Sequence, residues 1–180
     1  MKDPGPARQT PGRGLDLAEL FREHVSYVVH TLRRLGVREA DLEDVAHDVF
    51  LVVHRKLGDY DPARPIKPWL FGIAMRVALG YRRRAGHQRE VLVDEVHDAG
   101  EGARADATLE QERRRRMVHA ALEAIQDQRK QVFILHDLDG VAMPDIAAAL
   151  GIPLNTGYSR LRLARQEFRA ALERLGAKER

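Results

Sequence analysis

The sequence contains no cysteine, few aromatic residues and no long apolar run. Without cysteine, a disulfide framework, a thiolate metal site and a thiol nucleophile are all excluded, and a reducing compartment fits. Residues 1–14 are rich in proline, glycine and arginine. We therefore expect a disordered N-terminal tail there, rather than a signal peptide or a membrane span. These absences favour a cytoplasmic protein with no membrane insertion.

Helical periodicity dominates what is present. The 180 residues are 44% hydrophobic, enough for one domain or two small helical ones. Apolar residues recur at helical spacing, and no segment alternates as a strand would. We predict an all-α fold with a proline-containing loop over residues 58–68. The expected helices cover residues 17–35, 41–57, 69–84, 109–125, 127–138, 143–150 and 155–175.

Charge changes sign along the chain and divides it. Residues 60–87 carry six basic residues and one acid, whereas residues 88–112 carry eight acids and two bases. The acidic stretch also loses the helical pattern. We therefore expect two small helical domains, at 15–87 and 109–176, joined by a flexible acidic linker at 88–108. Basic blocks on both sides of the linker suggest two nucleic-acid surfaces on one chain.

Residues 138–171 have the pattern of a DNA-binding helix-turn-helix. A short helix is followed by a Gly-Ile-Pro turn at 151–153 and then by a helix with one apolar and one polar face. Tyr158, Ser159, Arg162 and Arg165 lie on the polar face, where arginine can bind guanine edges or phosphates. The alternative is a solvated amphipathic helix whose arginines only promote solubility.

Several motifs in a fixed order resemble the sigma-70 family of RNA polymerase sigma factors, specifically its small extracytoplasmic-function group. The resemblance covers residues 17 to about 175. In the N-terminal half it rests on DLEDVAHDVF at 41–50, YDP at 60–62, PWLFGIA at 68–74 and RRR at 82–84. In the C-terminal half it rests on QVFIL at 131–135, DIAAALGIP at 145–153 and SRL at 159–161.

The resemblance implies a sigma-2 domain and a sigma-4 domain in a non-enzymatic transcription initiation factor without a cofactor or bound metal. Its partners would be core RNA polymerase, through the beta-prime clamp helices and the beta flap, promoter DNA and an anti-sigma factor. Residues implied in binding core polymerase are Asp41, Glu43, Asp44, Asp48 and Phe50. Those implied in reading and melting the minus-10 element are Tyr60, Arg64, Lys67, Trp69, Phe71, Arg76, Arg82, Arg83 and Arg84. Those implied at the minus-35 element are Thr156, Tyr158, Ser159, Arg160, Arg162, Leu163 and Arg165.

The residues themselves leave some of these roles open. Basic and aromatic side chains together suit the binding of single-stranded bases, although Trp69 and Phe71 also suit a core. The acids at 41–48 also suit the start of a helix, where the dipole favours negative charge.

Four positions depart from the family pattern. Gly157 occupies an inward position that usually holds valine, so we expect lost packing, weaker minus-35 binding and a stabilising effect of Gly157→Val. Tyr158 and Leu163 stand where basic residues are common, which predicts a different DNA sequence preference. Gln126 replaces a frequent proline at a helix start.

Two other functions compete with this interpretation. A free-standing transcriptional regulator would explain the helix-turn-helix but not the N-terminal motifs, and would bind DNA without polymerase. A metal-dependent hydrolase is prompted by His47 and His54 beside Asp44 and Asp48, although a helix surface offers no pocket for a substrate.

Overall fold

A computed structural model describes residues 16–91 and 106–177; the expected tail and residues 92–105 of the expected linker lie outside these ranges. The described residues are all-α, as the sequence predicts. The α-helices are α1 (Leu17–Arg34), α2 (Leu42–Lys56), α3 (Ile66–Val91), α4 (Asp106–Glu123), α5 (Asp127–Phe133), α6 (Met143–Leu150) and α7 (Leu154–Ala177). Short 3-10 turns at Glu39–Asp41 and Leu57–Asp59 flank α2, and a π-helical turn at Ile134–Leu138 continues α5.

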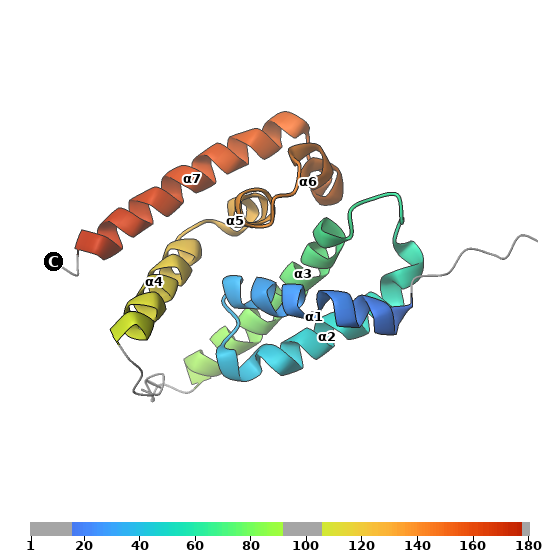
Figure 1. Cartoon of the computed structure of the whole chain (residues 1–180), viewed down its shortest axis with the longest axis horizontal. Helices are drawn as coiled ribbons and strands as arrows, with labels where there is room; N and C mark the ends of the chain where they lie inside the picture. Colours follow the sequence, from blue (N-terminus) through green and yellow to red (C-terminus); the bar gives the residue numbers. More distant parts are fainter. Residues whose placement is uncertain (1–15, 92–105, 178–180) are drawn as a thin grey trace, which may run out of the picture.

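Helices α1, α2 and α3 pack on one another and form the first unit (Figure 1). The Asp16 carboxylate accepts a hydrogen bond from the Ala18 backbone N–H and caps α1. The chain leaves α1 through Gly36, whose φ of +82° is readily adopted by glycine. Apolar residues on α2 face inward at helical spacing, as predicted from the sequence, and are buried against α1 and α3.

Helices α4 to α7 form the second unit, in which α7 packs along α4, α5 and α6 (Figure 1). The π-helical turn after α5 ends at Leu138, and the backbone N–H of the following Asp139 donates to the Ile134 carbonyl. Pro144 lies in the first turn of α6, where a missing N–H costs nothing. Gly151 then ends α6 in the left-handed conformation, with φ of +63°, and the chain turns into α7 as the sequence predicts.

The bounds of α3 and α4 differ from those expected. Helix α3 begins at Ile66 and takes in Pro68, because proline is tolerated in the first turn of a helix. It continues to Val91, and α4 begins at Asp106, so both ends of the expected linker are helical. The described residues contain no helix that is long and apolar enough to cross a membrane.

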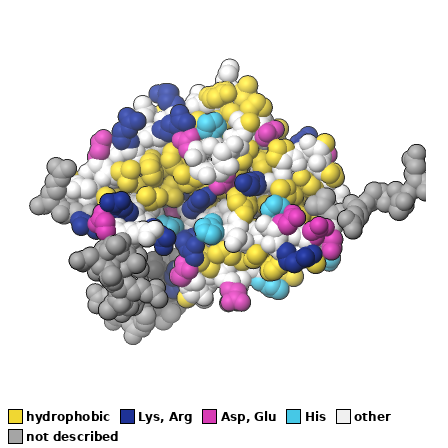
Figure 2. All heavy atoms as spheres, in the orientation of Figure 1, with side chains coloured by type: hydrophobic (Ala, Val, Ile, Leu, Met, Phe, Trp, Pro, Cys, Tyr) yellow, Lys and Arg dark blue, Asp and Glu magenta, His cyan; other side chains and the backbone are white. Residues whose placement is uncertain are grey.

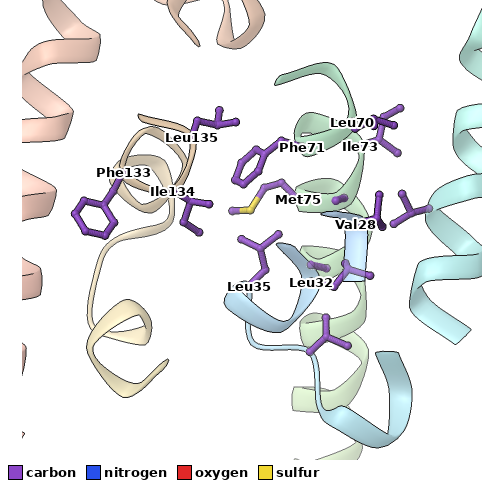
Figure 3. Packing of buried hydrophobic residues seen from close by; sticks show 14 of the residues in the cluster. Val28, Leu32, Leu35, Leu70, Phe71, Ile73, Met75, Phe133, Ile134 and Leu135 are labelled. Carbon is purple, nitrogen blue, oxygen red and sulfur yellow. The ribbon is translucent and has the colours of Figure 1, made fainter. Parts of the chain in front are cut away.

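The two units share one hydrophobic core. Leu35, Phe71 and Met75 of the first unit face Ile134 and Leu135 of the second (Figure 3). All five side chains are buried. We call this contact between the α1–α3 unit and the α4–α7 unit the junction.

Candidate nucleic-acid interface

The first half of α7 presents the polar face that the sequence predicts. Tyr158, Ser159, Arg162 and Arg165 are exposed, while Leu161 and Ala164 are buried against the rest of the unit. Lys and Arg side chains gather over the upper left of the surface in Figure 2, where Figure 1 shows α7. This is the arrangement of a recognition helix, with an apolar face that fixes it and a basic face that is accessible to DNA.

A groove lined mainly by polar residues opens between the start of α5 and the start of α7. It has a volume of about 350 Å³. Its lining includes Thr156, Arg160 and Leu163, all half-buried in the groove wall. Arg160 donates to the Gln128 side chain at 3.1 Å, so a residue of α5 orients this arginine. The groove suits a phosphate group, which hydroxyl, amide and guanidinium donors bind together.

Arg165 is engaged within its own unit. Its guanidinium forms two hydrogen bonds with Asp137, at 2.8 and 2.7 Å, across the gap between α7 and the π-helical turn. The Arg165 hydrogen bonds hold the pKa of Asp137 below its usual value, so the carboxylate remains charged at neutral pH. A DNA phosphate would have to compete with this carboxylate for Arg165.

The packing loss expected at Gly157 is absent. Gly157 is buried, and a Cβ placed there would lie 2.7 Å from the Sδ atom of Met143. Met143 is itself 2% exposed, so its thioether fills the space that a valine at 157 would occupy. The expectation that Gly157→Val stabilises the unit is therefore corrected, because added carbon atoms would collide with Met143.

The loop before α3 places two of the predicted minus-10 aromatics together. The rings of Tyr60 and Trp69 lie 5.0 Å apart, and both side chains are half-buried. The Tyr60 hydroxyl donates to the Arg64 carbonyl, which ties the loop to this aromatic pair. Lys67 is exposed and lies over the Tyr27 ring, with its Nζ 5.7 Å from the ring centroid.

Along α3 the predicted minus-10 residues divide into exposed and sequestered groups. Arg76, Arg83 and Arg84 are exposed. Phe71 is 0% exposed and faces the second unit at the junction, so in this arrangement it belongs to the core and cannot stack on a base (Figure 3). Arg82 is half-buried and binds Asp127 of α5 at 2.9 Å.

The predicted polymerase-binding residues on and just before α2 also divide into exposed residues and residues that are engaged within the chain. Glu43, Asp44 and Asp48 are exposed. Asp41 instead accepts hydrogen bonds from Tyr81 at 2.5 Å and Arg38 at 2.8 Å. The Tyr81 hydrogen bond, followed by the bond from Arg38, lowers its pKa.

Phe50 requires a correction, because it is 6% exposed and part of the core. Its ring packs edge-on against Phe21, with centroids 4.7 Å apart. Phe21 is 43% exposed and Leu51 is 41% exposed, and sequence reasoning assigned neither to a surface. Asp44, Asp48 and Leu51 follow one another at helical spacing, so α2 exposes a mixed acidic and apolar stripe.

Sequence reasoning also missed the acids that hold the basic residues: Glu123, Asp127, Asp137 and Asp139. Their partners lie far away in the sequence, and no local motif marks them. As for the hydrolase alternative, His47 and His54 are exposed, and no three potential metal-ligating groups gather anywhere in the described ranges 16–91 and 106–177.

The fold and the basic recognition helix define a helical DNA-binding protein of two units. Comparison with known families then identifies both units. The family model for Sigma-70 region 2 matches residues 20–88, and that for Sigma-70 region 4 matches residues 115–168.

Whole-chain relatives agree with these matches. RNA polymerase sigma factor CarQ of Myxococcus xanthus is 30% identical over 162 residues, which cover 89% of this chain and 90% of CarQ. RNA polymerase sigma factor CnrH of Cupriavidus metallidurans is 27% identical, with 93% of this chain and 92% of CnrH covered. The match to ECF RNA polymerase sigma factor SigE of Mycolicibacterium smegmatis, 29% identical, covers 84% of this chain but 59% of SigE.

Solved structures show the same fold. CnrH in complex with the cytosolic domain of CnrY matches with a TM-score of 0.63 and 26% identity, covering 90% of each chain. The sigma factor RpoE from Bartonella quintana, in complex with the anti-sigma factor NepR, matches with a TM-score of 0.64 and 19% identity. That match covers 88% of this chain and 97% of RpoE.

The chain belongs to the sigma-70 family of RNA polymerase sigma factors, in its extracytoplasmic-function group. It is therefore a promoter-directing transcription initiation factor, and the α1–α3 and α4–α7 units correspond to regions 2 and 4.

Proposed function

We propose that this chain binds core RNA polymerase in the cytoplasm and directs it to promoters, without catalysing a reaction itself. The α4–α7 unit would read the minus-35 element and the α1–α3 unit the minus-10 element. The observation that carries the proposal is the exposed basic face of α7, with Arg162 and Arg165 directly after a helix-turn-helix turn. The matching of both family regions on one chain argues against a free-standing regulator.

We propose that core polymerase docks on the exposed stripe of α2. Asp44 and Asp48 supply charge there, while Leu51 and the nearby Phe21 supply apolar area. A polar face with a small apolar centre is typical of protein–protein interfaces that form and dissociate. By analogy with the relatives solved with CnrY and NepR, an anti-sigma factor is a further proposed partner.

The test is transcription by core polymerase, with and without this chain, on a library of genomic promoters. We expect start sites that depend on the chain. Arg162→Ala should reduce transcription about tenfold or more, since one good base or phosphate contact contributes about 1–3 kcal/mol. The matched control is Arg174→Ala, because Arg174 is exposed on the same helix but lies near its other end.

Docking is tested separately by measuring the affinity for core polymerase. Asp44→Lys combined with Asp48→Lys should weaken binding, whereas Glu19→Lys on α1, also an exposed acid, should not. If no start site depends on the chain and core polymerase does not bind it, the proposed function is wrong.

A further inference from the structure

The carboxylate of Asp137 binds one edge of the Arg165 guanidinium group. Asp137 lies in the π-helical turn at Ile134–Leu138 and reaches α7, where Arg165 is 28 residues further along the chain. Arg165 Nε donates to one carboxylate oxygen at 2.8 Å, and Nη2 donates to the other at 2.7 Å. Two parallel hydrogen bonds of this kind fix the plane of a guanidinium group. Asp137 therefore sets the orientation of Arg165.

Asp137 is itself held in place from a second side. The Arg165 hydrogen bonds lower the pKa of Asp137, so its carboxylate is charged at neutral pH and only accepts hydrogen bonds. His136, whose Nδ1 lies 2.8 Å from the same carboxylate, therefore donates to it. The Asp137 side chain is 21% exposed, whereas that of Arg165 is 51% exposed. The carboxylate is thus fixed and partly shielded, while the arginine that it holds remains accessible.

This pairing leaves the outer end of the arginine with free donors. A guanidinium group has five N–H groups. Asp137 accepts from two of them, and among the described residues no other acceptor binds Arg165. The three that remain belong to Nη1 and Nη2, at the end of the side chain. This end can donate two hydrogen bonds to O6 and N7 of guanine, the commonest specific contact of arginine in the major groove.

Two other arginines on the same face of α7 have no such partner. Arg162 and Arg169 are exposed and, with Arg165, line a shallow hollow of about 290 Å³. In the part of the chain that the structure describes, no carboxylate pairs with either of them. An unpaired positive charge attracts phosphate groups whatever the base sequence. Arg165 differs from these neighbours because Asp137 offsets its charge and leaves its outer donors available to a base.

We propose that Asp137 is a positioning residue that makes Arg165 a reader of guanine in the minus-35 element rather than a contact to the DNA backbone. This inference rests on the proposed function. The pair has no net charge, so a phosphate gains little by approaching it, whereas a guanine edge gains two directional hydrogen bonds. A side chain that is already held also loses less entropy when it binds a base. Asp137 therefore lowers the affinity for DNA in general and raises the preference for one base pair.

The experiment measures base preference at each position of the minus-35 element. A promoter that depends on the chain in the transcription assay is randomised over its minus-35 element. Holoenzyme formed from core polymerase and the full chain is incubated with this DNA, and the bound fraction is sequenced. Arg165→Ala identifies the position that Arg165 reads, and Asp137→Asn removes the charge that holds the arginine. Glu39→Gln is the matched control, because Arg33 forms the same two hydrogen bonds with Glu39 in the first unit, at 2.8 and 2.6 Å.

Wild-type holoenzyme should prefer guanine at one position, on either strand, by about tenfold or more. Arg165→Ala and Asp137→Asn should each reduce this preference to about twofold or less and leave the other positions unchanged. Asp137→Asn should also steepen the slope of log affinity against log salt by about one, because the released arginine gains a phosphate contact. Glu39→Gln should match the wild type in base preference and in slope.

Circular dichroism checks that each variant remains helical. Asp137→Glu keeps the charge but moves the carboxylate by one methylene group, so it should give an intermediate preference at the same position. This variant decides the matter if Asp137→Asn unfolds.

A wild-type guanine preference in a folded Asp137→Asn variant would overturn the proposal, as would an Arg165→Ala variant that changes no position. Equal losses at all positions would overturn it as well, because they indicate an ion pair that only holds α7 in place. In each of these cases the wild-type holoenzyme still selects promoter sequences, so the proposed function stands. A wild-type holoenzyme with no base preference at any position would overturn both.

Discussion

The packing of Gly157 against Met143 can be tested by enlarging one side chain and shortening the other. Replacing a helical glycine with valine should gain about 0.4 kcal/mol from helix propensity. Against this, a Cβ at 157 would lie 2.7 Å from the buried Met143 Sδ, closer than such atoms can approach. Overpacking of this kind costs about 1–3 kcal/mol. We expect Gly157→Val to destabilise the chain by about 2 kcal/mol and to lower its melting temperature by about 4–8 °C.

Shortening Met143 tests whether its side chain causes the destabilisation expected for Gly157→Val. Met143→Ala alone should cost about 2–5 kcal/mol, because it leaves a cavity next to α7. Combining Gly157→Val with Met143→Ala restores the total number of side-chain carbon and sulfur atoms in the pocket. The double variant should therefore be more stable than the two single effects predict, with a coupling energy of about 1–3 kcal/mol.

Urea unfolding of the full chain, followed by circular dichroism, measures all four members of this cycle. Additive effects, within about 0.5 kcal/mol, would show that Met143 does not fill the space at 157. A melting temperature raised by Gly157→Val alone would refute the reasoning at its first step.

Three further predictions concern charge and backbone conformation. His119 is half-buried near Arg33, Arg34, Glu39 and Glu123, and burial, followed by repulsion from Arg33, lowers its pKa. The stability of the folded chain should therefore fall as the pH drops below about 6.5. In urea titrations between pH 7 and pH 5, His119→Gln should reduce that fall. Asp137→Asn should release Arg165 and tighten DNA binding severalfold at low salt, as measured by fluorescence anisotropy. Unchanged affinity would show that Arg165 does not contact DNA. Gly151→Ala should lower the free energy of unfolding by about 1 kcal/mol, because Gly151 has a positive φ. Gly58→Ala should not, because the space there is equally open and the φ is not positive. Equal losses of stability in thermal melts would contradict the backbone argument.

The sequence was sufficient for the helices because their signals are local. Apolar spacing along α2, the glycine that ends α6 and the proline within the turn before α7 all act over a few neighbouring residues. The same local reasoning places the start of α3 too late, because it puts Pro68 in the loop although a first helical turn accepts proline.

The junction could not be predicted in this way. Asp139 pairs with Arg34 and Tyr27 across 105 and 112 residues, and a single sequence carries no signal for partners so far apart. For the same reason Phe71 was open to two interpretations. Its position among basic residues suits base stacking, and its burial depends on which surface of the second unit lies opposite.

Charge counting along a sequence therefore gives an upper limit to the charge available for DNA. Arg82 and Arg165 lie in the predicted binding sets, yet Asp127 and Asp137 already neutralise them. Arg83 and Arg162 are exposed and therefore accessible to DNA. Because each phosphate contact adds to the dependence of binding on salt, releasing Arg82 and Arg165 should make DNA binding more sensitive to salt. A comparison of the salt dependence of DNA binding between wild type and Asp127→Asn combined with Asp137→Asn would measure the contribution of the two arginines, and equal slopes would show that neither arginine contacts DNA after release.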